Sequence, residues 1–455
     1  MKSRWLLIAG IAATLGTPVG AQTQASAVQP PKIEVQSTKL ENGLEVLMVE
    51  DHHSPMVNLE VWYHVGSKDE EPGRTGFAHL FEHLMFKGSA HVGPEEHSRI
   101  IEAVGGFDNA FTQDDYTQYF ETFPSNYLER VLWLEADRMG SLNVDEANFL
   151  SERKVVEEER RLRVDNQPYG LVQLDLYAAA FQVHGYHHTP IGSIEDLEKA
   201  TLEEVRQFHD TYYKPNNATI VIVGDITPSE VFGWAKKYFG GIPRSAKPIP
   251  RRDTPEPAQD KQRIVEKAYP NAPLPAVVEG YKMPAEFSAD SYALQLAANI
   301  LSQGESSRLY QSLVYKQQIA VQAAGFGNFT EDPNLFWVIA IMNPQHTVAE
   351  GEKSLDAALT EMKEKPVDAR ELEKAKNQIL AQFILQRSGD QAKADAVGNA
   401  VVIGKDLHLV NEELGRYMQV TPEDIQRVAQ KYFTAQNETV LRVTPPAAEN
   451  KGSGR

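Results

Sequence analysis

Two histidines and a glutamate stand close together in the sequence, at a spacing that suits a metal site. The segment His79-Leu-Phe-Glu82-His83 would place both imidazoles about one turn apart on one face of a helix, with Glu82 beside them. Two neutral imidazoles and one further protein ligand would leave a zinc ion one open position for water. A carboxylate next to that water can accept its proton, so we interpret Glu82 as a general base and not as a ligand.

The five residues follow the order H-x-x-E-H, the inverse of the commoner H-E-x-x-H motif, and both orders occur in zinc peptidases. An amphipathic helix with two histidines and a glutamate on its polar edge would have the same pattern. The neighbouring residues favour the metal site, because they would bury the helix, and buried imidazoles beside a carboxylate need partners. These apolar neighbours are Phe77, Leu80, Phe81, Leu84, Met85 and Phe86.

A third ligand is expected on a carboxylate-rich helix farther along the chain. Glu159 follows His83 by 76 positions and Glu152 precedes Glu159 by seven, and with this spacing the sequence resembles the pitrilysin-type zinc peptidases. In that family the glutamate that ends an E-x(6)-E pattern is the third zinc ligand, and the one that begins it supports catalysis. The resemblance implies one Zn²⁺ per chain, with Glu159 as ligand and Glu152 as the supporting catalytic residue. Glu157 and Glu158 compete for the ligand role, and only the family spacing prefers Glu159.

The composition narrows the kinds of site and partner. With 455 residues the chain is too long for one ordinary core, so at least two domains are expected. It contains no cysteine, which excludes disulfides, thiolate metal sites and a cysteine nucleophile. The formal charge of −18 disfavours nucleic-acid binding, because phosphate backbones require basic patches. The acidic residues either form a solubilising outer surface or, where they line an enclosed cavity, attract basic peptides.

The start of the chain has the features of an export signal followed by a disordered segment. A basic start, an apolar stretch over residues 5–15 and the small-residue cleavage site Val19-Gly-Ala21 are typical of a signal peptide. We expect residues 1–21 to be removed and residues 22–34, rich in Gln, Ala, Ser and Pro, to be disordered. The protein would then be periplasmic and not bound to a membrane, since no later segment has about 20 uninterrupted apolar residues. An uncleaved membrane anchor is the alternative.

The zinc motif falls in a first domain expected over residues 35–240. Alternating apolar residues predict strands there, and Asn109, Ala110 and Phe111 belong to an Asn-Ala-Phe-Thr run. In pitrilysin-type peptidases such a run is an edge strand beside the zinc, to which extended substrates add by main-chain hydrogen bonds. The resemblance therefore implies that these three residues bind a peptide substrate. An interior strand with a bulge near Gly105-Gly106 is the alternative.

The sequence indicates an internal duplication. Residues 201–223 align without a gap with residues 421–443 at an offset of 220, and Thr201, Glu203 and Asn217 are among the residues that recur. We therefore expect an α+β fold of two duplicated α/β sandwich domains that face one another across a cleft. The second copy lacks H-x-x-E-H, so we expect it to close over the substrate.

The two domains are expected to meet at a Pro-rich linker over residues 241–262, with the second domain at 263–446 and a tail at 447–455. In the second domain the family has an arginine and, seven positions on, a tyrosine that approach the substrate and the tetrahedral intermediate. Val314 and Val321 stand at these two positions, and neither side chain can donate a hydrogen bond. Loss of one such donor typically costs about a hundredfold in rate.

This departure from the family pattern implies a divided active site. Some members pair a zinc-bearing chain with a homologous zinc-less chain that supplies the arginine and tyrosine, so we expect a heterodimer, with a homodimer as second choice. Arg308, Tyr310 and Tyr315 would substitute only after a shift of register. The expected function is a zinc endopeptidase that acts on unfolded peptides in a closed chamber. A non-catalytic structural or assembly subunit is the rival hypothesis.

Overall fold

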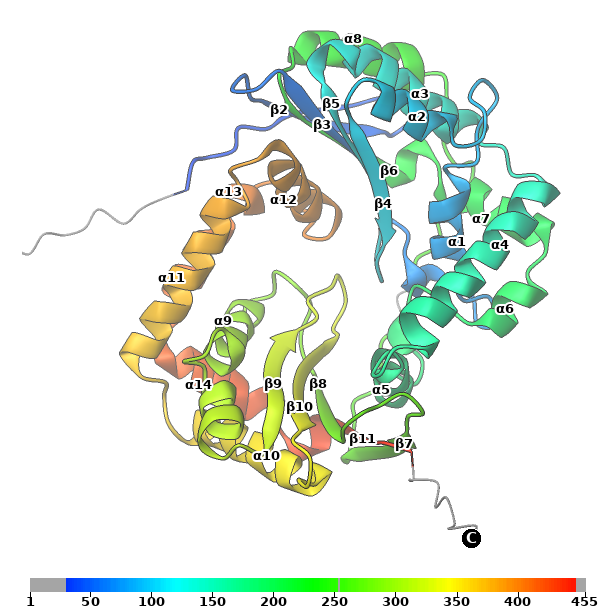
Figure 1. Ribbon diagram of the computed structural model, residues 1–455. Coiled ribbons are helices and arrows are strands. Elements are labelled where there is room, and N and C mark those ends of the chain that lie inside the picture. The colour runs from blue at the N-terminus through cyan, green and yellow to red at the C-terminus, as the bar shows by residue number, and fades with distance from the viewer. Residues whose placement is uncertain (1–29, 253, 447–455) are drawn as a thin grey trace, which may run out of the picture.

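The computed structural model describes residues 30–252 and 254–446, which form two halves, each built on one mixed sheet (Figure 1). The first sheet has the strand order β1-β2-β6-β3-β5-β4 and the second β7-β11-β8-β10-β9. The strands are β1 (Gln36–Lys39), β2 (Glu45–Glu50), β3 (Met56–Tyr63), β4 (Phe107–Thr112), β5 (Thr117–Pro124), β6 (Ala218–Gly224), β7 (Arg263–Ala268), β8 (Ala276–Lys282), β9 (Ala320–Gly327), β10 (Leu335–Met342) and β11 (Glu438–Thr444). The predicted signal peptide at 1–21 and tail at 447–455 lie outside the described residues.

Both sheets repeat one topology, which confirms the predicted α+β fold with two copies of one plan. In the first sheet β2 runs parallel to β6, and β3 pairs antiparallel with β6 and β5. In the second β7 runs parallel to β11, and β8 pairs antiparallel with β11 and β10. Matching capping boxes begin the helices before β6 and β11, with Thr201 and Glu204 in one copy and Thr421 and Asp424 in the other. Each box satisfies backbone N–H groups at a helix start, which explains why these residues recur.

Helices cover both sheets and enclose a core in each half. The first half has α1 (Phe77–Leu84), α2 (Glu96–Ala103), α3 (Leu128–Ser141), α4 (Glu146–Arg160), α5 (Val172–Ala180), α6 (Ile194–Lys199), α7 (Leu202–Tyr212) and α8 (Pro228–Phe239). The second half has α9 (Ser291–Ser302), α10 (Val348–Glu364), α11 (Ala369–Leu385), α12 (Asp390–Val402), α13 (Leu409–Gln419) and α14 (Pro422–Tyr432). Among the described residues, no helix combines the length and the apolar character that crossing a membrane requires.

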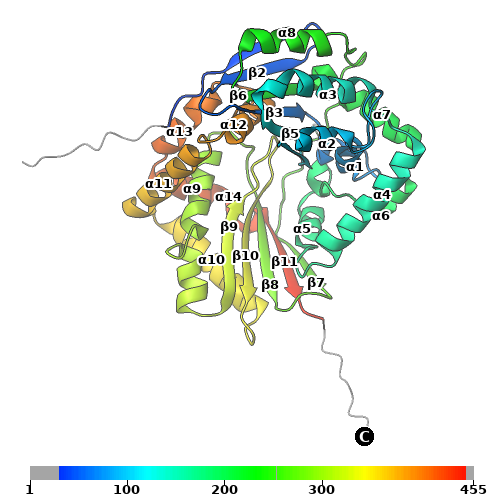
Figure 2. The ribbon, with the colours of Figure 1, turned by 45° about the horizontal axis from the view of Figure 1, so that its top comes forward.

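Each half also supplies one helix to the sheet of the other half. Helix α5 packs on the second sheet, where Leu176 and Val278 belong to one buried cluster. Helix α12 packs on the first sheet, where Val397 is buried with Trp62 and Val221. Figures 1 and 2 show α5 beside the second sheet and α12 beside the first. Because both contacts remove apolar surface from water, they hold the halves together independently of the linker.

The segment before β1 is partly ordered. Ile33 is buried, and its backbone N–H and C=O bond to the side chain of Asn411 on α13. The disorder expected over residues 22–34 therefore does not extend to Ile33, because this apolar side chain joins the cluster between the first sheet and α12. Residues 22–29 lie outside the described part of the chain.

The Pro-rich stretch at 241–262 touches both halves. The Glu256 carboxylate accepts hydrogen bonds from the backbone N–H groups of residues 182–184 in the first half. Lys282, at the end of β8 in the second half, donates to the same carboxylate at 3.2 Å. The Pro-rich stretch is therefore hydrogen-bonded to both of the halves that it connects.

Candidate metal centre

Helix α1 holds the H-x-x-E-H motif in a buried position. It begins after Gly76, whose φ of 94° lies in the left-handed region that glycine adopts without strain. The buried carboxylate of Glu70 accepts the backbone N–H groups of Gly76 and Ala78 at 2.8 Å each, which satisfies donors that a helix start leaves unpaired. The apolar face of α1 packs into the first core, and His79 and His83 lie on the side next to α4.

The structure brings together the three residues that the sequence predicts as metal ligands. Glu159 Oε2 lies 3.2 Å from His83 Nε2 and 3.7 Å from His79 Nε2, and donor atoms of all three residues lie within 4.8 Å of one another. Ligand atoms about 2.0–2.2 Å from a tetrahedral zinc ion are roughly 3.4 Å apart, so this donor set fits zinc. Burial lowers the pKa of His79 to about 4, which favours the neutral imidazole that a metal requires.

Glu152 contacts the cluster through His83. One carboxylate oxygen lies 3.6 Å from His83 Nδ1 and the other 3.1 Å from Lys87 Nζ. Seven residues are about two turns of α4, so Glu152 and Glu159 share one face of that helix. Although burial disfavours the imidazolium, the close carboxylates of Glu152 and Glu159 raise the pKa of His83 to about 9. A metal ion would therefore displace a proton from His83, and Glu152 would hold the ring in place.

Glu82 lies beside the end of β4. The hydroxyl of Thr112 donates a hydrogen bond of 2.7 Å to Glu82 Oε2. Burial raises the pKa of Glu82 above its ordinary value, which makes the carboxylate a stronger proton acceptor. Glu82 and Glu159 line one cavity of about 390 Å³.

The other two glutamates near the end of α4 pair with arginines. Glu157 lies 3.7 Å from Arg153 and 3.8 Å from Arg161. Glu158 lies 3.2 Å from Arg161, and 58% of its side chain is exposed. Of the three candidates for the third ligand, Glu159 is the one that reaches both histidines.

Sequence reasoning missed Lys87, Thr112 and Arg163 at this site. Arg163 Nη1 lies 2.8 Å from Glu159 Oε1, and its position four residues after Glu159 is a spacing that brings two helical side chains together. Thr112 is the last residue of the predicted Asn-Ala-Phe-Thr run. Both could have been found from sequence, whereas the contact of Lys87 with Glu152 depends on how α1 and α4 pack.

Strand β4 is the last strand of the first sheet, so the predicted edge position is confirmed and the interior alternative is wrong. Asn109 and Ala110 line the same cavity as Glu82 and Glu159. Phe111 lines a second cavity. Among the described residues, the outer edge of β4 beside the predicted zinc ligands therefore has main-chain groups without a strand partner.

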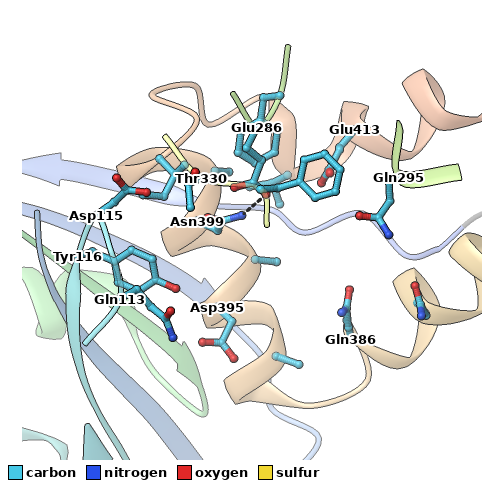
Figure 3. A pocket seen from close by; sticks show the side chains of 18 of the residues that line it. Gln113, Asp115, Tyr116, Glu286, Gln295, Thr330, Gln386, Asp395, Asn399 and Glu413 are labelled. Atoms are coloured by element: carbon cyan, nitrogen blue, oxygen red, sulfur yellow. Dashed lines mark hydrogen bonds between the residues drawn. The ribbon is translucent and has the colours of Figure 1, made fainter. Parts of the chain in front are cut away.

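The second cavity, of about 660 Å³, lies between the two halves (Figure 3). Its acidic lining residues are Asp114, Asp115, Glu286, Asp395 and Glu413. Burial raises the pKa of Glu286 to about 8, although Asn399 donates a hydrogen bond of 3.1 Å to it. Burial also raises the pKa of Glu413 to about 7. Some of the acidic residues of the chain therefore line a cavity, whereas the attraction of basic peptides stays a prediction.

Val314 and Val321 lie at the edge of the second half and line one shallow pocket. Val314 belongs to a π-helical segment, Tyr310–Lys316, and Val321 lies on the edge strand β9. Arg308, one of the possible substitutes, is held by both carboxylate oxygens of Glu371 at 2.7 and 3.0 Å. Figures 1 and 2 show β9 well separated from α1 and α4.

Comparisons with known proteins identify the family of the chain. The model of the insulinase family (peptidase family M16) matches residues 45–192, and the model of the peptidase M16 inactive domain matches residues 199–379. The zinc protease PqqE of Helicobacter pylori is 34% identical over 440 residues, which cover 96% of this chain and 98% of that protein. An uncharacterized zinc protease of Bacillus subtilis, YmxG, is 24% identical over 87% of this chain and 94% of its own length.

Solved structures have the same fold. The crystal structure of a protease from Helicobacter pylori matches with a TM-score of 0.88 and 34% identity, covering 91% of this chain and 100% of that one. The periplasmic protease PqqL from Escherichia coli matches with a TM-score of 0.76 at 19% identity, and the match covers 92% of this chain but 48% of that one. Taken with the family models and the 34% identity to a zinc protease, these likenesses mean that the chain belongs to peptidase family M16.

Proposed function

We propose that the chain is a zinc-dependent endopeptidase that hydrolyses unfolded peptides. The observation that carries the proposal is that His79, His83 and Glu159 converge beside Glu82 at an unpaired strand edge. A structural zinc site is closed by four protein ligands, whereas three ligands leave one position open for chemistry. The similarity to proteins described as zinc proteases supports the same activity.

The residues of the site have separate roles. A zinc ion held by the three predicted ligands would supply a Lewis acid for the scissile carbonyl and lower the pKa of a water molecule. Glu82 accepts a proton from the attacking water and passes it to the leaving amine, while Thr112 keeps the carboxylate in position. Glu152 orients His83. The main chain of residues 109–111 pairs with the substrate as an added strand, so the substrate must be extended.

The acidic cavity between the halves would select among extended peptides. It is lined by Phe111 on β4 and by residues 113–116, which follow this strand, so a peptide paired with β4 would extend toward the cavity. Those carboxyl groups of the wall that are ionised attract a lysine or arginine side chain more strongly than exposed carboxylates do, because the wall is poorly solvated. We therefore expect peptides with a basic residue near the scissile bond to be preferred.

The proposed active form is a heterodimer in a periplasmic location. Val314 and Val321 cannot donate hydrogen bonds, so a homologous zinc-less subunit would contribute the arginine and tyrosine that pitrilysin-type peptidases place near the substrate. The match to PqqL, which covers about half of that longer chain, is consistent with a closed chamber built from two units of this size. A homodimer is the second choice.

The test is cleavage of an internally quenched peptide library by the zinc-loaded chain without its first 21 residues. The chain is assayed alone and after addition of a zinc-less homologue from the same source, with Glu82→Gln as the blank. Cleavage only in the mixture supports the divided site. Full activity of the chain alone would overturn the prediction that a partner subunit is needed. A zinc content near zero, with no cleavage in either assay, would favour the rival hypothesis of a structural subunit.

A further inference from the structure

A second group of carboxylates lies in the half that lacks the zinc motif. Glu279 on β8, Glu438 on β11 and Asp356 on α10 each place a carboxylate oxygen within 4.8 Å of the others. Glu279 is 0% exposed and Glu438 4% exposed, whereas Asp356 is exposed. The two glutamates on the sheet are therefore buried, and the group is accessible to solvent at Asp356.

The hydrogen bonds of this group do not satisfy it. Tyr281 Oη lies 3.0 Å from Glu279 Oε2 and 3.1 Å from Glu438 Oε1, but a hydroxyl has only one proton to donate. Gln262 donates to the second oxygen of Glu438 at 2.7 Å. Glu279 Oε1 is buried without any hydrogen-bond partner. Across residues 30–252 and 254–446, no lysine, arginine or histidine forms an ion pair with these three carboxylates.

The first half shows that the fold does not need carboxylates at these positions. In the first sheet Val61 pairs with Ile220, and Tyr63 pairs with Ala218. In the second sheet the equivalent pairs are Glu279 with Val440, and Tyr281 with Glu438. The tyrosine is thus common to both halves, while Val61 and Ala218, both buried, are replaced by glutamates. A buried carboxylate is unfavourable unless a proton or a cation compensates its charge, so the replacement creates a place where a cation can bind.

We propose that Glu279, Asp356 and Glu438 bind a calcium ion. All available donors are oxygens, which suit a hard cation, and three carboxylates can supply up to about six of the 6–8 oxygens that Ca²⁺ takes. Mg²⁺ usually keeps several waters and requires near-octahedral geometry, which a site buried on one side does not favour. Zinc prefers nitrogen and sulfur. With the cation bound, Tyr281 can give its single proton to one glutamate without leaving the other uncompensated.

Calcium at this site would join three elements of the second half. It would connect β8, β11 and α10, and through Glu438 it would reach Gln259 and Gln262, where the linker enters β7. The expected role is to stabilise the second half, at a place separate from the zinc ligands of α1 and α4. The experiment therefore measures calcium binding and thermal stability, and not peptide cleavage.

The experiment titrates CaCl₂ into the zinc-loaded, calcium-free chain by calorimetry and follows thermal unfolding in parallel. We expect one calcium ion per chain and a rise in Tm of roughly 5 °C near saturation. Asp356→Asn, a substitution at the exposed ligand, should weaken binding at least tenfold. Glu361→Gln removes an exposed charge from the same helix outside the group and should bind calcium as the native chain does.

Glu279→Gln provides a second variant, because the amide has nearly the same shape as the carboxyl group; it should likewise weaken calcium binding at least tenfold and reduce the rise in Tm. Absence of calcium binding to the native chain up to 10-millimolar concentrations would overturn the proposal and mean that a shared proton satisfies the group. An equal rise in Tm in the native chain and in Asp356→Asn would overturn it as well, because calcium would then bind elsewhere. Peptide cleavage is not part of this readout, so the result is independent of the proposed function.

Discussion

Apart from the additional edge strand β1 of the first sheet, the two halves have the same strand order and matching capping boxes, yet they differ in the residues that their helices carry. Helix α1, which follows β3, presents His79, Glu82 and His83 beside α4. Helix α9, which follows β8 in the same way, buries apolar residues such as Leu296 and Leu301 in the second core. Capping, strand pairing and apolar spacing are thus sufficient to build either half. The chemistry depends on a few polar residues at positions that the fold leaves free.

The halves also differ in where they bury charge. The first half lines a cavity with Glu82, His83 and Glu159, and its core buries His97, Glu121 and Glu135 next to Arg138. The second half buries Glu279 and Glu438, with no ion-pair partner among the described residues. The exchange of α5 and α12 makes the two halves dependent on one another, because each sheet is completed by a helix of the other half. A duplicated fold can therefore divide its functions between the copies without separating them physically.

The largest expected effect comes from a substitution that removes the proposed general base from the first half. In Glu82→Gln, loss of the proton acceptor should lower kcat by about 10²–10⁴-fold. The zinc content should stay near one per chain, because Glu82 is not a predicted ligand. Peptide cleavage and metal analysis measure the two quantities. Glu158→Gln, at an exposed position of α4, is the control and should keep its activity; loss of zinc from Glu82→Gln would refute the role of general base.

A graded series on α4 separates a ligand from a supporting residue. Glu159→Gln should lower zinc affinity by more than the roughly 10–100-fold expected for Glu152→Gln, which removes only a residue that orients a ligand. Glu157→Gln, which pairs with arginines, should leave the affinity unchanged. Competition with a chromogenic chelator gives the three affinities. Equal losses for Glu157 and Glu159 would mean that the predicted ligand set is wrong.

A substitution at the exchanged helix α12 tests how tightly the halves are joined. A Cβ added at Gly398 would lie 2.3–2.5 Å from atoms of the Trp62 ring. Gly398→Ala should therefore lower the free energy of unfolding by about 1–3 kcal/mol, as overpacking does. Gly415→Ala, on α13 with nothing within 4 Å of the new Cβ, should raise it by about 0.5–1 kcal/mol. Urea unfolding of both variants measures these values, and a Gly398→Ala chain as stable as the native one would contradict the close packing.

The smallest effect concerns the acidic cavity between the halves. Burial raises the pKa of Glu286 to about 8, so this carboxyl is largely neutral at pH 7 and becomes charged as the pH rises to 9. A lysine side chain keeps its charge over this range. The ratio of kcat/KM for lysine-containing over norleucine-containing peptides should therefore rise a few fold from pH 7 to pH 9, and this rise should be smaller in Glu286→Gln. If the ratio rises as much with pH in Glu286→Gln as in the native chain, Glu286 takes no part in substrate selection.

Local features of the sequence were sufficient for much of the fold. The capping box at Thr201, its counterpart at Thr421 and the alternating residues of the strands predict elements that the structure contains. The same reasoning found the two histidines, because a spacing of four residues on a helix fixes their proximity. The choice of Glu159 and the edge position of β4 came from the family resemblance, since no local pattern distinguishes Glu159 from Glu157.

The sequence by itself determined the motif on α1, the duplication and the absence of thiol chemistry, because these depend on residue identity and on interactions within a turn or a strand. Only the tertiary structure decided which glutamate reaches His79 and His83, that α5 and α12 are exchanged, and that Glu279, Asp356 and Glu438 converge. Such contacts join residues that stand tens to hundreds of positions apart. They arise when sheets and helices bury their apolar faces against one another, and no short-range pattern records that packing.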